Sequence, residues 1–213
     1  MEEIKKEPIT VLFILLNILI FLIVDFTGGS ENTAHMIECG AAYPPLILEN
    51  GEIYRLFTCM FLHFGIYHIA NNMLVLFVLG QRLEPVVGKI KFILIYLLGR
   101  SWWKSFFLLL WKLKSADYAV SAGASGAVFA VMGANALCSY SKSWKNSGYF
   151  RTTDGDYGRI LIVFRFTSTG VDNAAHVGGM ACGFILAAVL YHPGNFSGRT
   201  MWKDVSPSDS ISA

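Results

Sequence analysis

The sequence predicts an all-α, polytopic membrane protein folded as a bundle of six transmembrane helices. Of its 213 residues, 54% are hydrophobic and 15% are charged, whereas soluble domains average about 45–50% and about 25%. Apolar segments recur along the chain between polar connections, and the mean hydropathy is +0.49. The net charge of +2 is too small to indicate a nucleic-acid partner.

The expected helices follow the apolar segments, several of which are shorter than the roughly 20 residues that a lone span needs. Arg100 and Lys104 interrupt the third segment, and the fifth is the shortest. Residues 1–8 and 194–213 flank one membrane domain, 9–193, and the polar C-terminal segment is expected to be disordered. In order, the segments are Ile9–Val24 (ended by Asp25), Ile66–Leu79, Ile90–Leu110, Ala122–Leu137, Ile160–Phe166 and Ala174–Tyr191.

The charges of the connections predict the orientation of the bundle. The long connection between the first two helices is acidic and carries Arg55 as its single cation. The connections on the opposite side are basic, so the positive-inside rule places both termini in the cytoplasm and the acidic connection outside. The basic side comprises Lys5, Lys6, Arg82, Lys89, Lys91, Lys142, Lys145, Arg151, Arg159, Arg199 and Lys203.

Polar side chains lie near the starts of the expected second, fourth and sixth helices. Such groups are costly inside a bilayer, so each is a candidate for function. His68 and Asn72 are four residues apart and share one helix face. Ser125 follows Gly123-Ala124 at the start of the fourth helix, and His176 lies near the start of the sixth. Because these three helices begin on the outer side, we expect the four side chains at similar depth near that surface.

This arrangement is suited to attack on a carbonyl group. A serine at a helix N-terminus lies beside unpaired N–H groups and the positive end of the helix dipole, which would stabilise an oxyanion. His176 could take the proton of Ser125 and return it to a leaving amine. His68 and Asn72 could donate hydrogen bonds to the oxyanion, and Gly123 and Gly126 would let a substrate backbone approach closely.

The fourth and sixth helices must lie close together for this chemistry. Gly179 and Gly183 are four residues apart on the sixth helix, a spacing of small residues that lets helix backbones touch in a membrane. Gly126 and Ala130 supply a similar small face on the fourth helix. We therefore expect these residues to pack the two helices whatever the function.

The motifs HFGIYHIANN, GASG and AHVGGMACG, in this order, resemble those of the rhomboid family of intramembrane serine proteases. Tyr54-Arg55 resembles the aromatic–arginine pair of the family's first outer loop. The resemblance extends from the first helix to about Tyr191. It implies that Ser125 is the nucleophile and His176 the general base, without an acidic third member. His68 and Asn72 would line the oxyanion hole, and Arg55 would be structural.

The resemblance also implies the surroundings of the reaction. It implies no cofactor and no metal, and substrates that are single-pass transmembrane proteins in the lipid bilayer. They would be cut near the outer membrane face, at helix-destabilising sequences and after a small residue. A bacterial plasma membrane fits the compact six-helix form best. Residues 100–104 and 141–159 depart from the family pattern, and the fifth helix is too short in consequence.

Other interpretations of the same residues stay open. Ser125 could be only a helix N-cap, because serine is favoured there. His68 and Asn72 could bind each other or a backbone carbonyl group, and His63, His68 and His176 could bind a metal ion. A catalytically inactive relative that binds membrane helices would keep the same fold. A transporter or channel would need charged residues along a path at mid-membrane depth, for which Arg100 and Arg165 are the only hints.

Overall fold

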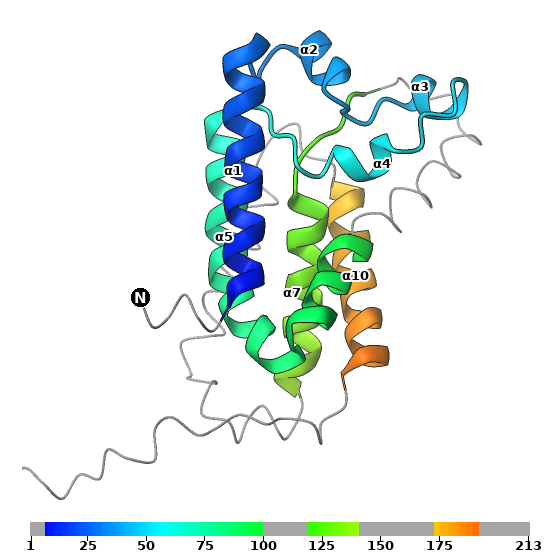
Figure 1. Ribbon diagram of the computed structural model, residues 1–213. Coiled ribbons are helices and arrows are strands. Elements are labelled where there is room, and N and C mark those ends of the chain that lie inside the picture. The colour runs from blue at the N-terminus through cyan, green and yellow to red at the C-terminus, as the bar shows by residue number, and fades with distance from the viewer. Residues whose placement is uncertain (1–6, 100–118, 141–172, 192–213) are drawn as a thin grey trace, which may run out of the picture.

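The described chain is a bundle of long helices with three short helices at one end (Figure 1). The computed structural model describes residues 7–99, 119–140 and 173–191. The rest of the expected third helix, the fifth helix and the stretches 100–104 and 141–159 lie outside the described residues. The long helices are α1 (Pro8–Gly28), α5 (Gly65–Val87), α7 (Ser125–Tyr140) and α10 (Asn173–Leu190), with a further helix over residues 89–99.

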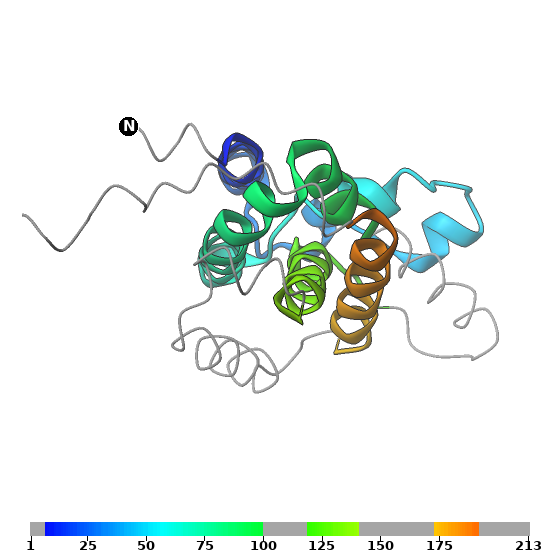
Figure 2. The ribbon, with the colours of Figure 1, turned by 90° about the horizontal axis from the view of Figure 1, so that it is seen from below.

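The central element is α7. Every residue from Gly123 to Asn135 is buried, as expected of a helix that is apolar on all sides. α7 contacts α5 on one side and α10 on the other, and the view along the bundle shows it between them (Figure 2). The helix over residues 89–99 packs on α1, where Phe13 stacks on Tyr96 with ring centroids 4.3 Å apart.

α1 has the dimensions and composition of a membrane span. Among the described residues it is the one helix that is both long and apolar enough to cross a bilayer, with a mean hydropathy of 2.8. Its 21 residues extend over about 31 Å, which matches a hydrocarbon core of about 30 Å. α5 is longer, with 23 residues, but His68, Asn72 and Glu84 make it more polar. The outward side chains of α1 include Leu12, Leu15, Ile18, Leu19, Leu22, Ile23 and Phe26.

Glu84 of α5 holds the start of α1. The carboxylate of Glu84 is buried and accepts hydrogen bonds from the backbone N–H groups of Ile9 and Thr10, at 3.0 and 2.8 Å. It also accepts one from the Thr10 hydroxyl at 2.7 Å. The first N–H groups of a helix have no partner within it, so this carboxylate acts as a cap supplied by another helix. Gly80, one turn earlier, lets the Thr10 side chain lie directly against α5.

Four predicted helix boundaries are wrong by at least three residues. α1 continues through Asp25 to Gly28, and the Asp25 carboxylate accepts hydrogen bonds from the backbone N–H and hydroxyl of Ser30 instead of ending the helix. α5 continues past Leu79 to Val87, and hydrogen bonds from the start of α1 offset the cost of burying the Glu84 carboxylate. α7 spans Ser125–Tyr140 instead of Ala122–Leu137. α10 differs from the predicted Ala174–Tyr191 by one residue at each end.

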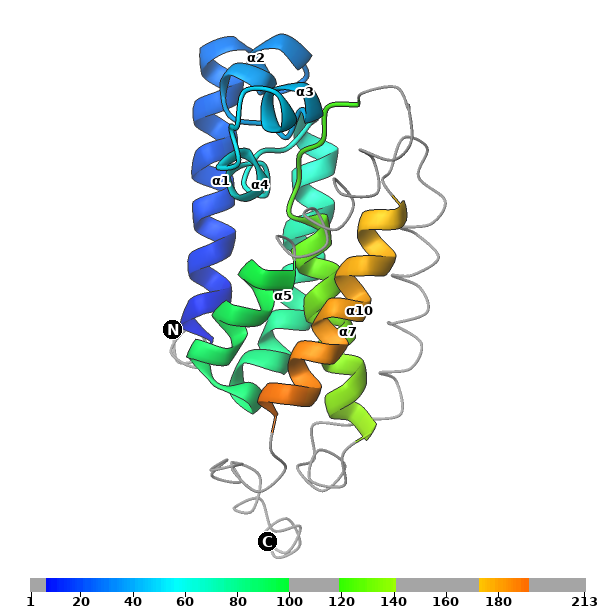
Figure 3. The ribbon, with the colours of Figure 1, turned by 90° about the vertical axis from the view of Figure 1, so that its right-hand side faces the viewer.

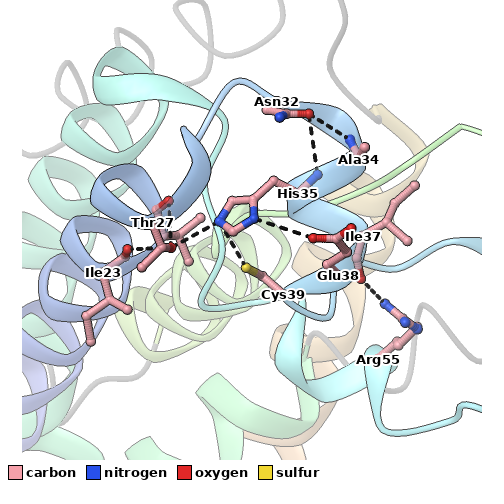
Figure 4. Close-up of polar contacts among 10 residues, drawn as sticks. Ile23, Thr27, Asn32, Ala34, His35, Ile37, Glu38, Cys39 and Arg55 are labelled. Atoms are coloured by element: carbon pink, nitrogen blue, oxygen red, sulfur yellow. Dashed lines mark hydrogen bonds and ion pairs between the residues drawn. The ribbon is translucent and has the colours of Figure 1, made fainter.

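The connection between α1 and α5 folds over one end of the bundle as three short helices, α2 (Thr33–Glu38), α3 (Pro44–Leu48) and α4 (Arg55–Thr58). His35 of α2 attaches it to α1 (Figure 4): its Nε2 lies 3.1 Å from the Thr27 hydroxyl and 3.4 Å from the Cys39 sulfur. The imidazole also covers Gly28, where a side chain would overlap it. Met36, on the same short helix, is fully buried.

Candidate active site

Ser125 is the first residue of α7. The segment before it is extended, and the backbone of Ser121 exchanges two hydrogen bonds with Ala42, of 2.9 and 3.0 Å. Gly123 has a φ of +123°, outside the range that other residues adopt readily, which explains why the helix begins after it. The Ser125 side chain therefore lies beside the unpaired N–H groups of the first turn, and the residue is only 8% exposed.

His176 lies against the same region of α7. Its imidazole stacks on the ring of Phe129, with centroids 4.2 Å apart and planes 11° from parallel. Phe129 is four residues after Ser125, so the two share one face of α7. His176 is 1% exposed. The fold thus brings His176 to the α7 face that carries Ser125, from a position about fifty residues later in the sequence.

Small residues allow α7 and α10 to approach this closely (Figure 3). A side chain added at Gly179 would overlap the carbonyl oxygen of Gly126, and one added at Gly183 would overlap that of Ala130. Gly133 makes the reciprocal approach to the backbone of Met180. The close packing expected from Gly179 and Gly183 is therefore present, and it sets the distance between the helices that carry Ser125 and His176.

His68 and Asn72 of α5 lie beside the segment that precedes Ser125. A methyl group added at Gly123 would come 2.7 Å from His68 Cε1, 2.8 Å from its Nε2 and 3.9 Å from the side-chain nitrogen of Asn72. Asn72 is fully buried, and its side-chain nitrogen donates a hydrogen bond to the carbonyl oxygen of His68 at 3.0 Å. The four residues selected from the sequence therefore converge on the start of α7 from three helices.

Two residues near this site were not expected from the sequence. Phe129 stacks on His176, and its position four residues after Ser125 was the available signal. His63 is 1% exposed, and its Nε2 accepts a hydrogen bond from the backbone N–H of Ala124 at 3.2 Å. The sequence suggested His63 only as a candidate metal ligand, since no sequence pattern specifies a contact between residues 61 positions apart.

Arg55 is the first residue of α4, in the connection between α1 and α5. Arg55 is 5% exposed, and its guanidinium donates hydrogen bonds to the carbonyl oxygens of Ile37 and Ala41 and to the Glu52 carboxylate. The hydrogen bond from Arg55, followed by one from Tyr54, lowers the pKa of Glu52 below its ordinary value. These contacts connect the end of α2 to the start of α4.

Comparison with known proteins identifies the family. A family profile described as the rhomboid domain matches residues 50–193. The chain is 37% identical to Rhomboid protease GluP of Bacillus subtilis (strain 168) over 194 residues, which cover 88% of this chain and 36% of that protein. It is 34% identical to RHOMBOID-like protein 1 of Arabidopsis thaliana over 158 residues, covering 71% and 38%.

The similarity extends to a more distant relative, Rhomboid-like protease 1 of Toxoplasma gondii, at 27% identity over 162 residues, covering 74% of this chain and 53% of that protein. The chain thus spans between about a third and a half of the length of these relatives. The matched region contains α5, α7 and α10, which carry the candidate site. The chain belongs to the rhomboid family, a family of polytopic membrane proteins that includes intramembrane proteases.

Proposed function

We propose that this protein is an intramembrane serine endopeptidase that uses Ser125 as nucleophile and His176 as general base. The observation that carries the proposal is the stacking of His176 on Phe129, one helical turn from Ser125 on the central helix. Both polar residues are buried. Ser125 belongs to one face of α7, and His176 of α10 packs on that same face. Two buried polar residues in this arrangement are better explained by joint chemistry than by helix capping alone.

In the proposed reaction, the imidazole of His176 takes the Ser125 hydroxyl proton as the oxygen attacks the carbonyl carbon of the scissile peptide bond. The carbonyl oxygen becomes an oxyanion, which His68, Asn72 and the N–H groups at the start of α7 stabilise. His176 then gives its proton to the departing amine, and an acyl-enzyme forms at Ser125. Water hydrolyses this ester by the same two proton transfers, which releases the acid and restores the hydroxyl group.

The substrates that we propose are single-pass transmembrane proteins, cut near the outer membrane face. The start of α7 lies at the end of the bundle that α2, α3 and α4 cover (Figure 1). In the topology inferred from the basic residues, six helices span the membrane, this end faces outward and both termini are cytoplasmic. A bacterial plasma membrane is the proposed location, in keeping with the similarity to the Bacillus protein. Residues 9–193 would form the membrane domain.

The test is covalent labelling of the detergent-solubilised protein by a fluorescent fluorophosphonate, which reacts with activated serines. We expect the parent protein to be labelled, and Ser125→Ala and His176→Ala to lose the signal. Ser121→Ala is the matched control, because Ser121 lies four residues away and is held through its backbone; its labelling should persist. Circular dichroism and thermal melting would establish that each variant is folded. A folded parent protein that is not labelled would favour the inactive relative that binds membrane helices.

A further inference from the structure

Among the residues that the structure describes, His63 is the buried histidine that the proposed reaction does not use. It lies between α4 and α5, five residues before His68, and is 1% exposed. Its Nε2 atom is 3.2 Å from the backbone nitrogen of Ala124, the residue immediately before Ser125. This hydrogen bond joins the start of α5 to the start of α7, so both helices of the candidate oxyanion site meet at His63.

The direction of this hydrogen bond defines the chemistry of the imidazole. The backbone N–H of Ala124 is the donor, so Nε2 must present its lone pair. The ring is therefore neutral with its proton on Nδ1. The backbone N–H of Ala124 therefore requires a hydrogen-bond acceptor at position 63. An imidazole protonated on both nitrogens has no acceptor atom.

His63 also contacts the other half of the candidate oxyanion site. Its ring meets that of His68 edge to face, with centroids 5.2 Å apart and planes at 72°. The His68 ring in turn lies directly against Gly123. A second hydrogen bond, from the Gly123 N–H to the carbonyl oxygen of Cys59 at 2.9 Å, holds the same turn. His63 therefore orients both the peptide that leads into Ser125 and the ring of His68.

We propose that His63 is a positioning residue for the oxyanion site, acting as the neutral acceptor that orients the Ala124 peptide and supports the His68 ring. The inference rests on the proposed function of Ser125. His63 does not touch the reacting atoms. It acts through the backbone of Ala124 and through His68, and its loss should slow the chemical step more than it weakens ligand binding.

Two variants of similar size distinguish the effect of the hydrogen-bond acceptor at position 63 from the effect of side-chain volume. His63→Gln retains a carbonyl oxygen that can accept the Ala124 N–H, whereas His63→Met fills a similar volume with a much weaker acceptor. The full chain would be titrated with the fluorophosphonate probe, to obtain the maximal labelling rate and the probe concentration at half that rate. His35→Met is the matched control, because His35 lies in α2 and contacts Thr27 and Gly28 instead of Ala124.

We expect His63→Met to lower the maximal labelling rate by about 100-fold with little change in the half-saturating probe concentration. His63→Gln should recover most of that rate, and His35→Met should keep the parent rate while melting earlier. Equal impairment of folded Gln and Met variants would overturn the inference, as would an unimpaired Met variant. If His63→Met alone failed to fold, the hydrogen-bond acceptor at position 63 would be needed for folding, and this result would also overturn the inference. A folded parent protein without labelling would refute the proposed function itself, which distinguishes the two failures.

Discussion

The imidazole of His176 lies flat against the ring of Phe129, with centroids 4.2 Å apart. This contact joins α10 to the central helix one turn below Ser125, and it limits the directions in which the imidazole can point. We therefore expect the Phe129 ring to hold the proposed base, His176, where the proposed nucleophile, Ser125, can use it.

Phe129→Leu tests this orientation. We expect the maximal rate of fluorophosphonate labelling to fall by about tenfold or more, because a misplaced catalytic group reacts slowly even when the fold is intact. Phe129→Tyr keeps the aromatic face and should retain most of the rate. Melting temperatures would be measured beside the rates, since loss of a buried aromatic ring also destabilises the protein. Parent-like labelling of Phe129→Leu would show that the stacking does not orient the base.

Gly123→Ala tests the contact between the segment before Ser125 and α5. The added methyl group would lie 2.7 Å from His68 Cε1, at a φ of +123°. Displacement of His68 should reduce labelling by about 100-fold. Gly51→Ala is the control for backbone strain, because Gly51 also has a positive φ, of +73°, but nothing lies within 4 Å of the added methyl group. It should be destabilised by roughly 1–2 kcal/mol and keep its labelling rate.

Gly183→Ala tests the packing of α7 on α10. The methyl group would overlap the carbonyl oxygen of Ala130, and a backbone atom cannot move aside as a flexible side chain can. We expect a lower melting temperature and a free energy of unfolding reduced by about 1–3 kcal/mol. Labelling should be lost as His176 moves away from α7. Ala181→Leu, on an exposed position of the same helix, should leave both properties unchanged. Parent-like stability of Gly183→Ala would contradict this account of the interface.

Glu84→Gln tests the cap that α5 provides for α1. The amide nitrogen of glutamine would replace one of the two acceptor oxygens that now face the N–H groups of Ile9 and Thr10. Leaving a buried donor unsatisfied should lower stability by about 1–3 kcal/mol, while labelling below the melting temperature stays near the parent rate. Glu38→Gln is the matched control at a largely exposed carboxylate, and it should melt within a degree or two of the parent.

Acid should destabilise the connection between α1 and α5 through Glu52. The hydrogen bonds from Arg55 and Tyr54 hold the pKa of Glu52 below its ordinary 4.5. A lowered pKa in the folded state means that Glu52 contributes stability above pH 4.5, and that the contribution is lost as the pH falls through the lowered value. Melting temperatures measured from pH 7 to pH 3 should therefore fall less steeply below pH 4.5 in Glu52→Gln than in the parent. Identical slopes would contradict the prediction.

Sequence patterns predicted much of the candidate site because the relevant signals are local. His68 and Asn72 share a face by their spacing, and the glycines beside Ser125 indicate a helix start that a ligand could approach. The family resemblance, now confirmed, joined these local signals to His176. The predicted roles of these residues remain to be tested by the labelling experiments.

Within the described residues, the sequence by itself determined the apolar helices, their order and the polar residues at their starts, since these follow from hydropathy and short-range periodicity. The tertiary structure alone decided which residues meet. It decided that α7 begins at Ser125, because Gly123 turns there against His68. It also decided that α5 continues past Glu84 to Val87 and that His63 binds the Ala124 peptide. Each of these depends on a contact between segments far apart in the chain, which no local pattern encodes.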